Sequence, residues 1–384
     1  MPRVPRDAGE AESLVHAARA AERVYAFSQA TDLYDRALKV LNLAMPRSPE
    51  RVCEVLLLKE AALERLGRRA DQISSIDEAL AVAEPLGDAS RLATILLRRA
   101  GACTYLGCHT EARGAAERAL AVYRGIGDQP GEAEALRELG FVHWHAEEHA
   151  AALRYARDAL ALHRRLGDVA GEASALHNLA EIHRGLGSPR LALDWYEQAL
   201  RLHWAAQNHE GEILSLFGMA SALHQAGDLS GATGKCKAAL QLSELHGVRT
   251  MQSRALHALA MQHAAQSDLD SALTFLRRAI EVDRAIGYAH ALGHDLVDLS
   301  AIHLRRAERV EARMALREAL VWFDFTEDHD AQASTRVRLS DIGTDRETLP
   351  PLAVLRYGVK SHLALGEGKV YCEFESPLGA RLRG

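Results

Sequence analysis

The chain has 384 residues, five cysteines and a formal net charge of −6. A mildly acidic chain is poorly suited to sequence-independent binding of phosphate backbones, so we expect no direct nucleic-acid partner. The cysteines are odd in number and form no CxxC pair, which is typical of reduced thiols in the cytoplasm. No stretch approaches 18 apolar residues, so we expect a soluble, cytoplasmic protein without a membrane partner.

Residues 1–10 are charged and small, and we predict that they are disordered. From residue 11 to residue 326 the sequence repeats with a period of forty residues, most clearly in 131–168 and 171–208. A fixed period of this length is typical of a solenoid, in which each unit packs on its neighbours.

Each unit contains two predicted helices, here called the A helix and the B helix. A leucine column marks the A helix at Leu96, Leu136, Leu176, Leu216, Leu256 and Leu296. Two alanine columns seven residues apart share one face of the B helix. They are Ala112, Ala152, Ala192, Ala232, Ala272 and Ala312, and Ala79, Ala119, Ala159, Ala199, Ala239, Ala279 and Ala319.

Glycines mark the turns between the helices. Gly67, Gly107, Gly187 and Gly227 follow A helices, where a helix end favours a positive φ. Gly-Asp pairs at 87–88, 127–128 and 167–168 follow B helices, and the aspartate can cap the next helix.

These positions carry a family resemblance. Leu136, Leu139, Gly140, His143, Ala152 and Ala159 fall at the spacing of the tetratricopeptide signature. The chain resembles the roughly forty-residue form of that repeat. The resemblance implies an all-α, right-handed α-solenoid of about eight helix hairpins with a concave groove. The layout is also similar to the C-terminal repeat regions of bacterial, notably actinobacterial, transcriptional regulators.

Two segments follow the array. We predict a capping helix within residues 327–345, because a polar helix face can terminate a stack. Residues 346–384 form a tail, in which residues 368–377 alternate apolar and polar side chains as a short strand does.

A second stripe on the A helices supplies the candidate ligand-binding residues, because the resemblance places this stripe in the concave groove. Aromatic side chains supply apolar area that a ligand can bury, arginine binds carboxylates, and asparagine forms hydrogen bonds with a peptide backbone. The candidates are Arg137, Phe141, Trp144, His177, Asn178, Glu181, Arg184, Phe217, His224, His257 and Met261. The alternative is that Phe141, Trp144 and Phe217 are covered by neighbouring repeats or by the tail. Arg137, Arg184 and Arg254 give the groove a slightly basic character, which favours an acidic or C-terminal carboxylate ligand.

The histidines suggest chemistry that their positions argue against. His143, His183, His263 and His303 stand one or more repeats apart, too far to share a metal ion, so we predict structural hydrogen bonds for them. Residues 145–149, HAEEH, match the letters of a zinc-protease motif but fall on a predicted turn rather than a helix. We therefore predict no catalytic residues, no metal and no cofactor.

Three functional hypotheses remain. The first is the sensor or interaction arm of a bacterial regulatory system, which binds a protein or peptide. The second is a stand-alone, quorum-type peptide sensor, and the third, less favoured, is an enzyme on the same scaffold. In a further variant the tail occupies the groove as an autoinhibitor.

Overall fold

The computed structural model describes residues 6–44, 48–326 and 328–342. Residues 1–342 form one compact unit. The predicted tail, with its strand at 368–377, lies outside the described residues.

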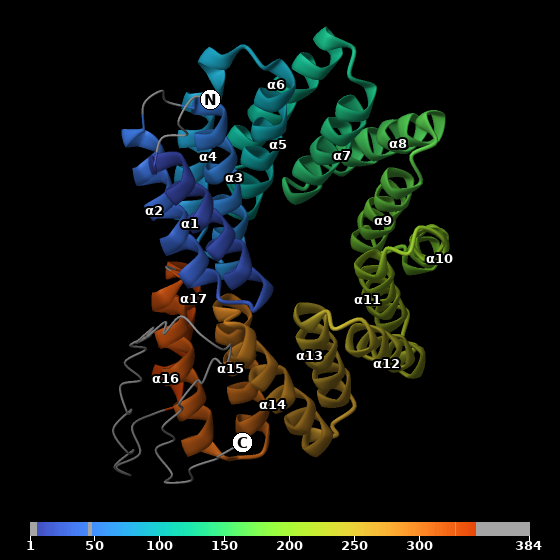
Figure 1. Ribbon diagram of the computed structural model, residues 1–384. Helices are drawn as coiled ribbons and strands as arrows, with labels where there is room; N and C mark the ends of the chain where they lie inside the picture. The colour runs from blue at the N-terminus through green and yellow to red at the C-terminus, as the bar shows by residue number, and fades with distance from the viewer. Residues whose placement is uncertain (1–5, 45–47, 327, 343–384) are drawn as a thin grey trace. The chain divides into compact units, whose positions relative to one another are not determined.

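The described residues form seventeen α-helices, of which the first sixteen make eight consecutive hairpins (Figure 1). The helices are α1 (Arg6–Arg23), α2 (Phe27–Leu43), α3 (Pro49–Leu66), α4 (Arg69–Ala83), α5 (Ala89–Tyr105), α6 (His109–Ile126), α7 (Gln129–His145), α8 (His149–Leu166), α9 (Val169–Gly185), α10 (Pro189–Ala205), α11 (His209–Gln225), α12 (Leu229–Leu245), α13 (Arg249–Ala265), α14 (Leu269–Ile286), α15 (Ala289–Arg305), α16 (Arg309–Phe325) and α17 (His329–Asp341). A 3-10 turn, η1 (Glu84–Leu86), extends α4. The fold is an α-solenoid, as predicted.

The array starts with α1, and one further helix, α17, follows its last hairpin. The helix α1 begins at Arg6, whereas the sequence analysis predicts disorder through residue 10. At the other end α17 packs on α16 within the segment for which a capping helix is predicted, and it buries the polar Gln332 and Thr335.

The predicted glycine and aspartate positions set the helix ends. Gly67 adopts φ 74° and Gly227 adopts φ 86°, a region that residues with a Cβ avoid. The Asp128 side chain accepts a hydrogen bond from the Gly131 N–H at 3.0 Å, and Asp168 does the same for Gly171 at 3.0 Å. These caps satisfy N–H groups that have no partner inside the helix.

Four turns in the middle of hairpins reach the same backbone conformation without glycine. Tyr25, Glu147, Ser267 and Ala307 all have φ between 59° and 64°. A left-handed conformation costs an L-residue about 1–2 kcal/mol, so the surrounding hairpin holds these turns in place.

The small-residue columns form the contact between paired helices. Every alanine of the two predicted columns has an exposed fraction of 0%. At Gly140 of α7, an added Cβ would lie 3.3 Å from the backbone nitrogen of Ala156 on α8. The two backbones therefore approach so closely that only small side chains fit between them.

The A helices form an inner layer and the B helices an outer one. The successive A helices α5, α7, α9, α11 and α13 contact one another directly. In Figure 1 the helices α8, α10 and α12 lie outside α7, α9 and α11. No helix of the described ranges is long and apolar enough to cross a membrane.

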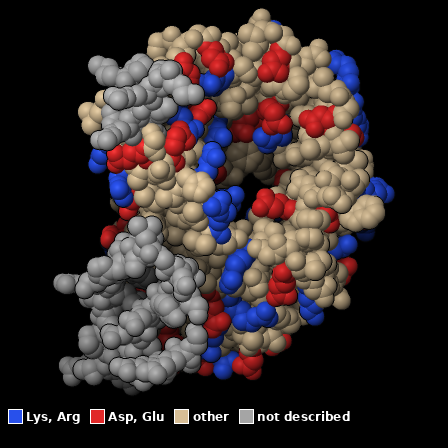
Figure 2. Space-filling model, in the orientation of Figure 1, with Lys and Arg blue, Asp and Glu red and all other residues tan. Residues whose placement is uncertain are grey.

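The curvature of the array brings its early and late hairpins into contact within residues 1–342. The turn after α3 meets α15, where an added Cβ on Gly67 would lie 2.8 Å from the Cβ of His290. Similarly, a Cβ on Gly287 would lie 3.7 Å from the carbonyl oxygen of Tyr25. The inner faces of distant repeats therefore face one another across a hollow, which Figure 2 shows.

Candidate ligand-binding face

The predicted groove residues all lie on the A helices α7, α9, α11 and α13, and the structure groups them into separate clusters. Each of them is partly or fully accessible. Both basic and acidic side chains surround the hollow in Figure 2.

The first cluster joins α5 and α7 through aromatic rings. The Phe141 ring lies 5.6 Å from that of Tyr105 and 4.4 Å from that of His145. The Arg69 guanidinium lies over the Tyr105 ring, 4.8 Å from its centroid. Tyr105 remains 58% exposed, so this cluster offers an aromatic surface that a ligand can reach.

Trp144 packs against the next repeat. Its indole lies against the backbone of Gly185 at the end of α9, where any added Cβ would overlap the ring. Its ring centroid is 5.3 Å from that of His149. Trp144 is thus partly covered by the next repeat, as the alternative interpretation of the sequence allows.

On α9 a hydrogen-bonded network surrounds Glu181. The carboxylate accepts a short hydrogen bond from the Tyr196 hydroxyl and a second from Arg184 Nη2 at 2.7 Å. Burial would raise the pKa of Glu181, but these two donors outweigh it and hold the pKa below its usual value. Glu181 is therefore ionised at neutral pH and compensates the charge of Arg184.

His177 lies beside this network with its ring 5.4 Å from that of Tyr196. Burial lowers its pKa, so the imidazole is neutral at pH 7. Its Nδ1 is buried and has no hydrogen-bond partner among the described residues.

An open cleft of about 450 Å³ lies where α9, α11 and α13 meet, within the usual size range of ligand sites. Its lining combines amides, an imidazole, a thioether and a guanidinium: Arg184, Ser221, His224, Gln225, Met261 and Gln262. Three of these residues, Arg184, His224 and Met261, are predicted groove residues from three successive repeats. His224 Nδ1 and Gln262 Oε1 lie 2.9 Å apart, which fixes both side chains at one end.

Arg254 lies on α13 seven residues before Met261, on the same side of the helix, and does not itself line the cleft. Its guanidinium lies over the Phe217 ring, 5.5 Å from the centroid, and its side chain is exposed. Arg254 also acts electrostatically on His177 of α9 and on Tyr105 of α5. Its charge therefore reaches the inner faces of three hairpins at once.

His257 of α13 lies next to two carboxylates of α15. Its Nδ1 lies 2.7 Å from Asp295 Oδ1 and its Nε2 lies 3.6 Å from Asp298 Oδ2. Burial opposes the charged imidazole, but the hydrogen bond to Asp295 and the nearby carboxylates raise its pKa. His257 thus interacts with its own neighbours and does not line the cleft.

Two of the three arginines expected to make the face basic are paired with glutamates. Arg137 pairs with Glu134 at 2.9 Å, and Arg184 pairs with Glu181 at 2.7 Å. Among the described residues Arg254 has no carboxylate within ion-pair distance, so the basic character rests on this residue. Glutamates three residues from each arginine are the sequence signal for this pairing.

Sequence reasoning missed Tyr105 and Gln262 as parts of this surface. Both belong to positions adjacent to the predicted stripe, so a wider stripe on each A helix would have included them. For Asn178, the structure records only partial burial and gives it no particular partner.

Three of the four histidines that stand one or more repeats apart make the predicted hydrogen bonds. His143, His263 and His303 pair through Nδ1 with a carboxylate five residues later, at 2.5, 3.1 and 2.6 Å. Residues 146–148 of the HAEEH segment form the turn between α7 and α8, as predicted. Its Glu148 pairs with His143 and with Arg113.

Comparison with known proteins places this array among repeat proteins. The family model described as tetratricopeptide repeat matches residues 91–165 and again residues 132–203. A search of curated proteins returned no match.

Three solved structures illustrate the similarity of the fold. A signal transduction ATPase with numerous domains from Pyrococcus horikoshii, which has a tetratricopeptide repeat sensor, is 17% identical with a TM-score of 0.52, over 85% of this chain and 50% of that chain. A Rap protein complexed with Competence and Sporulation Factor is 15% identical with a TM-score of 0.54, over 87% of this chain and 98% of that chain. The Rap conjugation gene regulator of the plasmid pLS20, in complex with the Phr* peptide, is 16% identical with a TM-score of 0.53, over 71% and 73%. This chain therefore spans half of the ATPase, and identities this low show a common fold alone.

Proposed function

The chain is a tetratricopeptide-repeat protein, and we propose that it binds a peptide or protein segment on the inner face of α5, α7, α9, α11 and α13. The observation that carries this proposal is the cleft between α9, α11 and α13, because three successive repeats each supply a predicted groove residue to it.

The side chains around the cleft define the chemistry of the ligand. Arg254 offers a guanidinium without a carboxylate partner among the described residues, which suits a ligand carboxylate. Phe217 offers apolar surface directly under Arg254. Within the cleft Met261 offers further apolar surface, and Gln225 offers an amide that can pair with a peptide backbone. We therefore expect a peptide with an apolar side chain next to an acidic residue or a free C-terminus.

The names of the similar proteins support a regulatory setting for this proposal. One of them carries a tetratricopeptide repeat sensor on a signal transduction ATPase, and another is a gene regulator in complex with a peptide. By analogy this chain is the sensor or interaction arm of a bacterial regulatory system. The alternative is a stand-alone peptide sensor, which the likeness over 98% of the Rap protein's length favours.

A peptide library tests the ligand class. The purified chain is used to select from random peptides displayed either with a free C-terminus or with a blocked one. We expect enrichment of peptides with an apolar residue next to a carboxylate, and competition between them for a single site. Enrichment of basic peptides, or selection that is unchanged in the Arg254→Glu variant, would contradict the proposed face.

A second experiment separates the two regulatory settings. Tagged chain is recovered from the native host and its tightly bound proteins are identified. An interaction arm should bring an ATPase or a DNA-binding protein in a fixed ratio. A stand-alone sensor should bring a peptide, and its release by a selected library peptide would identify the same groove.

A further inference from the structure

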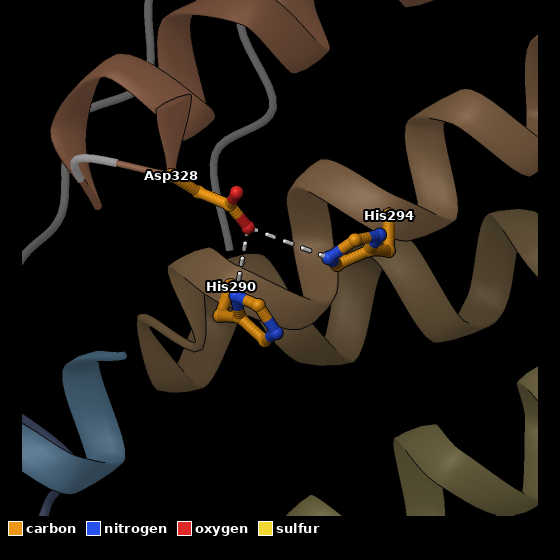
Figure 3. Close-up of side chains that lie close together, drawn as sticks. All are labelled: His290, His294 and Asp328. Atoms are coloured by element: carbon orange, nitrogen blue, oxygen red, sulfur yellow. Dashed lines mark ion pairs between the residues drawn. The ribbon is translucent and has the colours of Figure 1, made fainter. Parts of the chain in front are cut away.

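Two histidines of α15 and one aspartate at the start of α17 converge outside the cleft described above. Figure 3 shows the imidazoles of His290 and His294 on one side of the helix, both facing the carboxylate of Asp328. The two histidines are four residues apart, so one turn of helix places them on the same face. That spacing is the one that helical metal sites use to present two imidazoles to one ion.

The three ligand atoms lie at separations that one metal ion can bridge. His290 Nδ1 and His294 Nε2 each lie 3.9 Å from Asp328 Oδ2, and the three atoms all lie within 4.8 Å of one another. A point about 2.5 Å from all three atoms therefore exists, while zinc bonds to nitrogen and oxygen measure about 2.0–2.2 Å. Movements of a few tenths of an ångström, within the reach of side-chain rotation, complete the coordination.

Each ligand already has a contact that orients it. Asp328 uses its other oxygen, Oδ1, to accept the Ala331 N–H at 2.9 Å, so Oδ2 is directed away from α17. The His294 ring meets the buried Phe323 ring edge to face at 5.0 Å, and the His290 Cβ packs on Gly67. Contacts of this kind fix ligand orientation before a metal arrives.

The group is accessible to an ion. The side chains of His290 and His294 are 45% and 49% exposed, and that of Asp328 is 25% exposed. One cation, Arg69, acts electrostatically on His290, but its guanidinium is held at 2.7 Å from Gln72 Oε1 and over the Tyr105 ring. It therefore has partners of its own and does not fill the space between the three ligands.

We propose that His290, His294 and Asp328 bind a divalent transition-metal ion of the zinc class, with water in the remaining position. Two imidazoles and a carboxylate are the donor set that zinc accepts. The ion joins α15 to α17 and thereby ties the last hairpin to the helix that follows it. It lies beside the contact of α15 with the turn after α3, so it also stiffens the place where early and late hairpins meet.

Zinc titration of the purified, chelator-treated chain tests this proposal. Isothermal calorimetry should detect one tight site per chain, and saturating zinc should raise the thermal unfolding midpoint by about 3–5 °C. His290→Asn, His294→Asn and Asp328→Asn should each weaken the tight site at least ten-fold, because loss even of an indirect partner costs about that much. An asparagine retains the helix cap that Asp328 provides, so the last variant folds normally.

The matched control is His246→Asn. His246 and His209 form a second pair of neighbouring histidines, stacked with ring centroids 3.5 Å apart. Glu212 pairs with His209 at 3.1 Å, but these residues do not form a group that could hold a metal ion among the described residues. The control variant should bind zinc like the original chain. Equal zinc affinity in the original chain and the three site variants, loss of the tight site in His246→Asn, or no tight site at all would each overturn the proposal. Unchanged unfolding midpoints without metal show that the variants are folded.

Discussion

Asp283 on α14 is the buried group whose replacement has the clearest expected effect. Its side chain is fully buried, and neither carboxylate oxygen has a hydrogen-bond partner among the described residues. Burial, reinforced by the charge of Asp295, raises its pKa from 3.8 to about 7, while Ser253 and His257 act in the opposite direction. We expect Asp283→Asn to stabilise the protein at neutral and alkaline pH.

The size of the effect follows from the difference in pKa between the two states. The unfolded chain loses this proton near pH 3.8 and the folded chain near pH 7, so stability falls as the pH rises between these values. Each pKa unit corresponds to about 1.4 kcal/mol, which makes the cost about 4 kcal/mol above pH 7 and close to zero below pH 4. The asparagine side chain of the variant has no proton to lose, so the difference between the two proteins follows this curve.

Urea unfolding between pH 4 and pH 8 measures the effect, with Asp158→Asn as the control because Asp158 is exposed on α8. The variant should gain stability relative to the original chain as the pH rises, and the control should not. In both the original chain and the Asp283→Asn variant, the free energy of unfolding still decreases somewhat as the pH rises. The reason is that the raised pKa of His257 stabilises the fold below pH 6.5, and this contribution is lost as the pH rises further. A pH-independent difference would refute the reasoning.

Two further substitutions test the packing and the turns. Ala159→Leu places a larger side chain where the exposed fraction is 0%, so it should cost about 1–3 kcal/mol in urea unfolding; an unchanged midpoint would show that the helices can separate there. Ala307→Gly relieves a φ of 62° and should raise the free energy of unfolding by about 1 kcal/mol; a lower value would show that the turn is not strained.

The repeat predicts the scaffold well because its packing positions obey local rules. A methyl group at each alanine column and a glycine or aspartate at each helix end are requirements of a close helix pair, and they recur along the array. The first hairpin departs from this pattern, and there the sequence also misplaces the start of α1.

The candidate site is less predictable because its side chains interact across repeats. The pairing of Arg184 with Glu181 is a local contact that i,i+3 spacing could have suggested. The packing of Trp144 on Gly185 and the approach of Arg254 to Phe217 join A helices of successive repeats. These contacts depend on the curvature of the array, which forty-residue periodicity does not specify.

The group formed by His290, His294 and Asp328 also depends on contacts between helices that the sequence does not show. The spacing of two histidines on one helix is visible in the sequence, but their partner Asp328 lies beyond the next helix and reads as an ordinary helix cap. Only the packing of α17 against the preceding hairpin brings the carboxylate to the imidazoles.

The most direct test of the central claim compares two matched double variants. One, Phe217→Ala with Arg254→Glu, changes the inner face; the other, Trp204→Ala with Arg201→Glu, makes similar changes at exposed positions of the outer helix α10. Their affinities for a fluorescent library-selected peptide are measured by anisotropy, with circular dichroism as the check on helicity. We predict at least about 30-fold weaker binding for the inner variant and unchanged binding for the outer one. Equal affinities, or loss confined to the outer variant, would contradict the account.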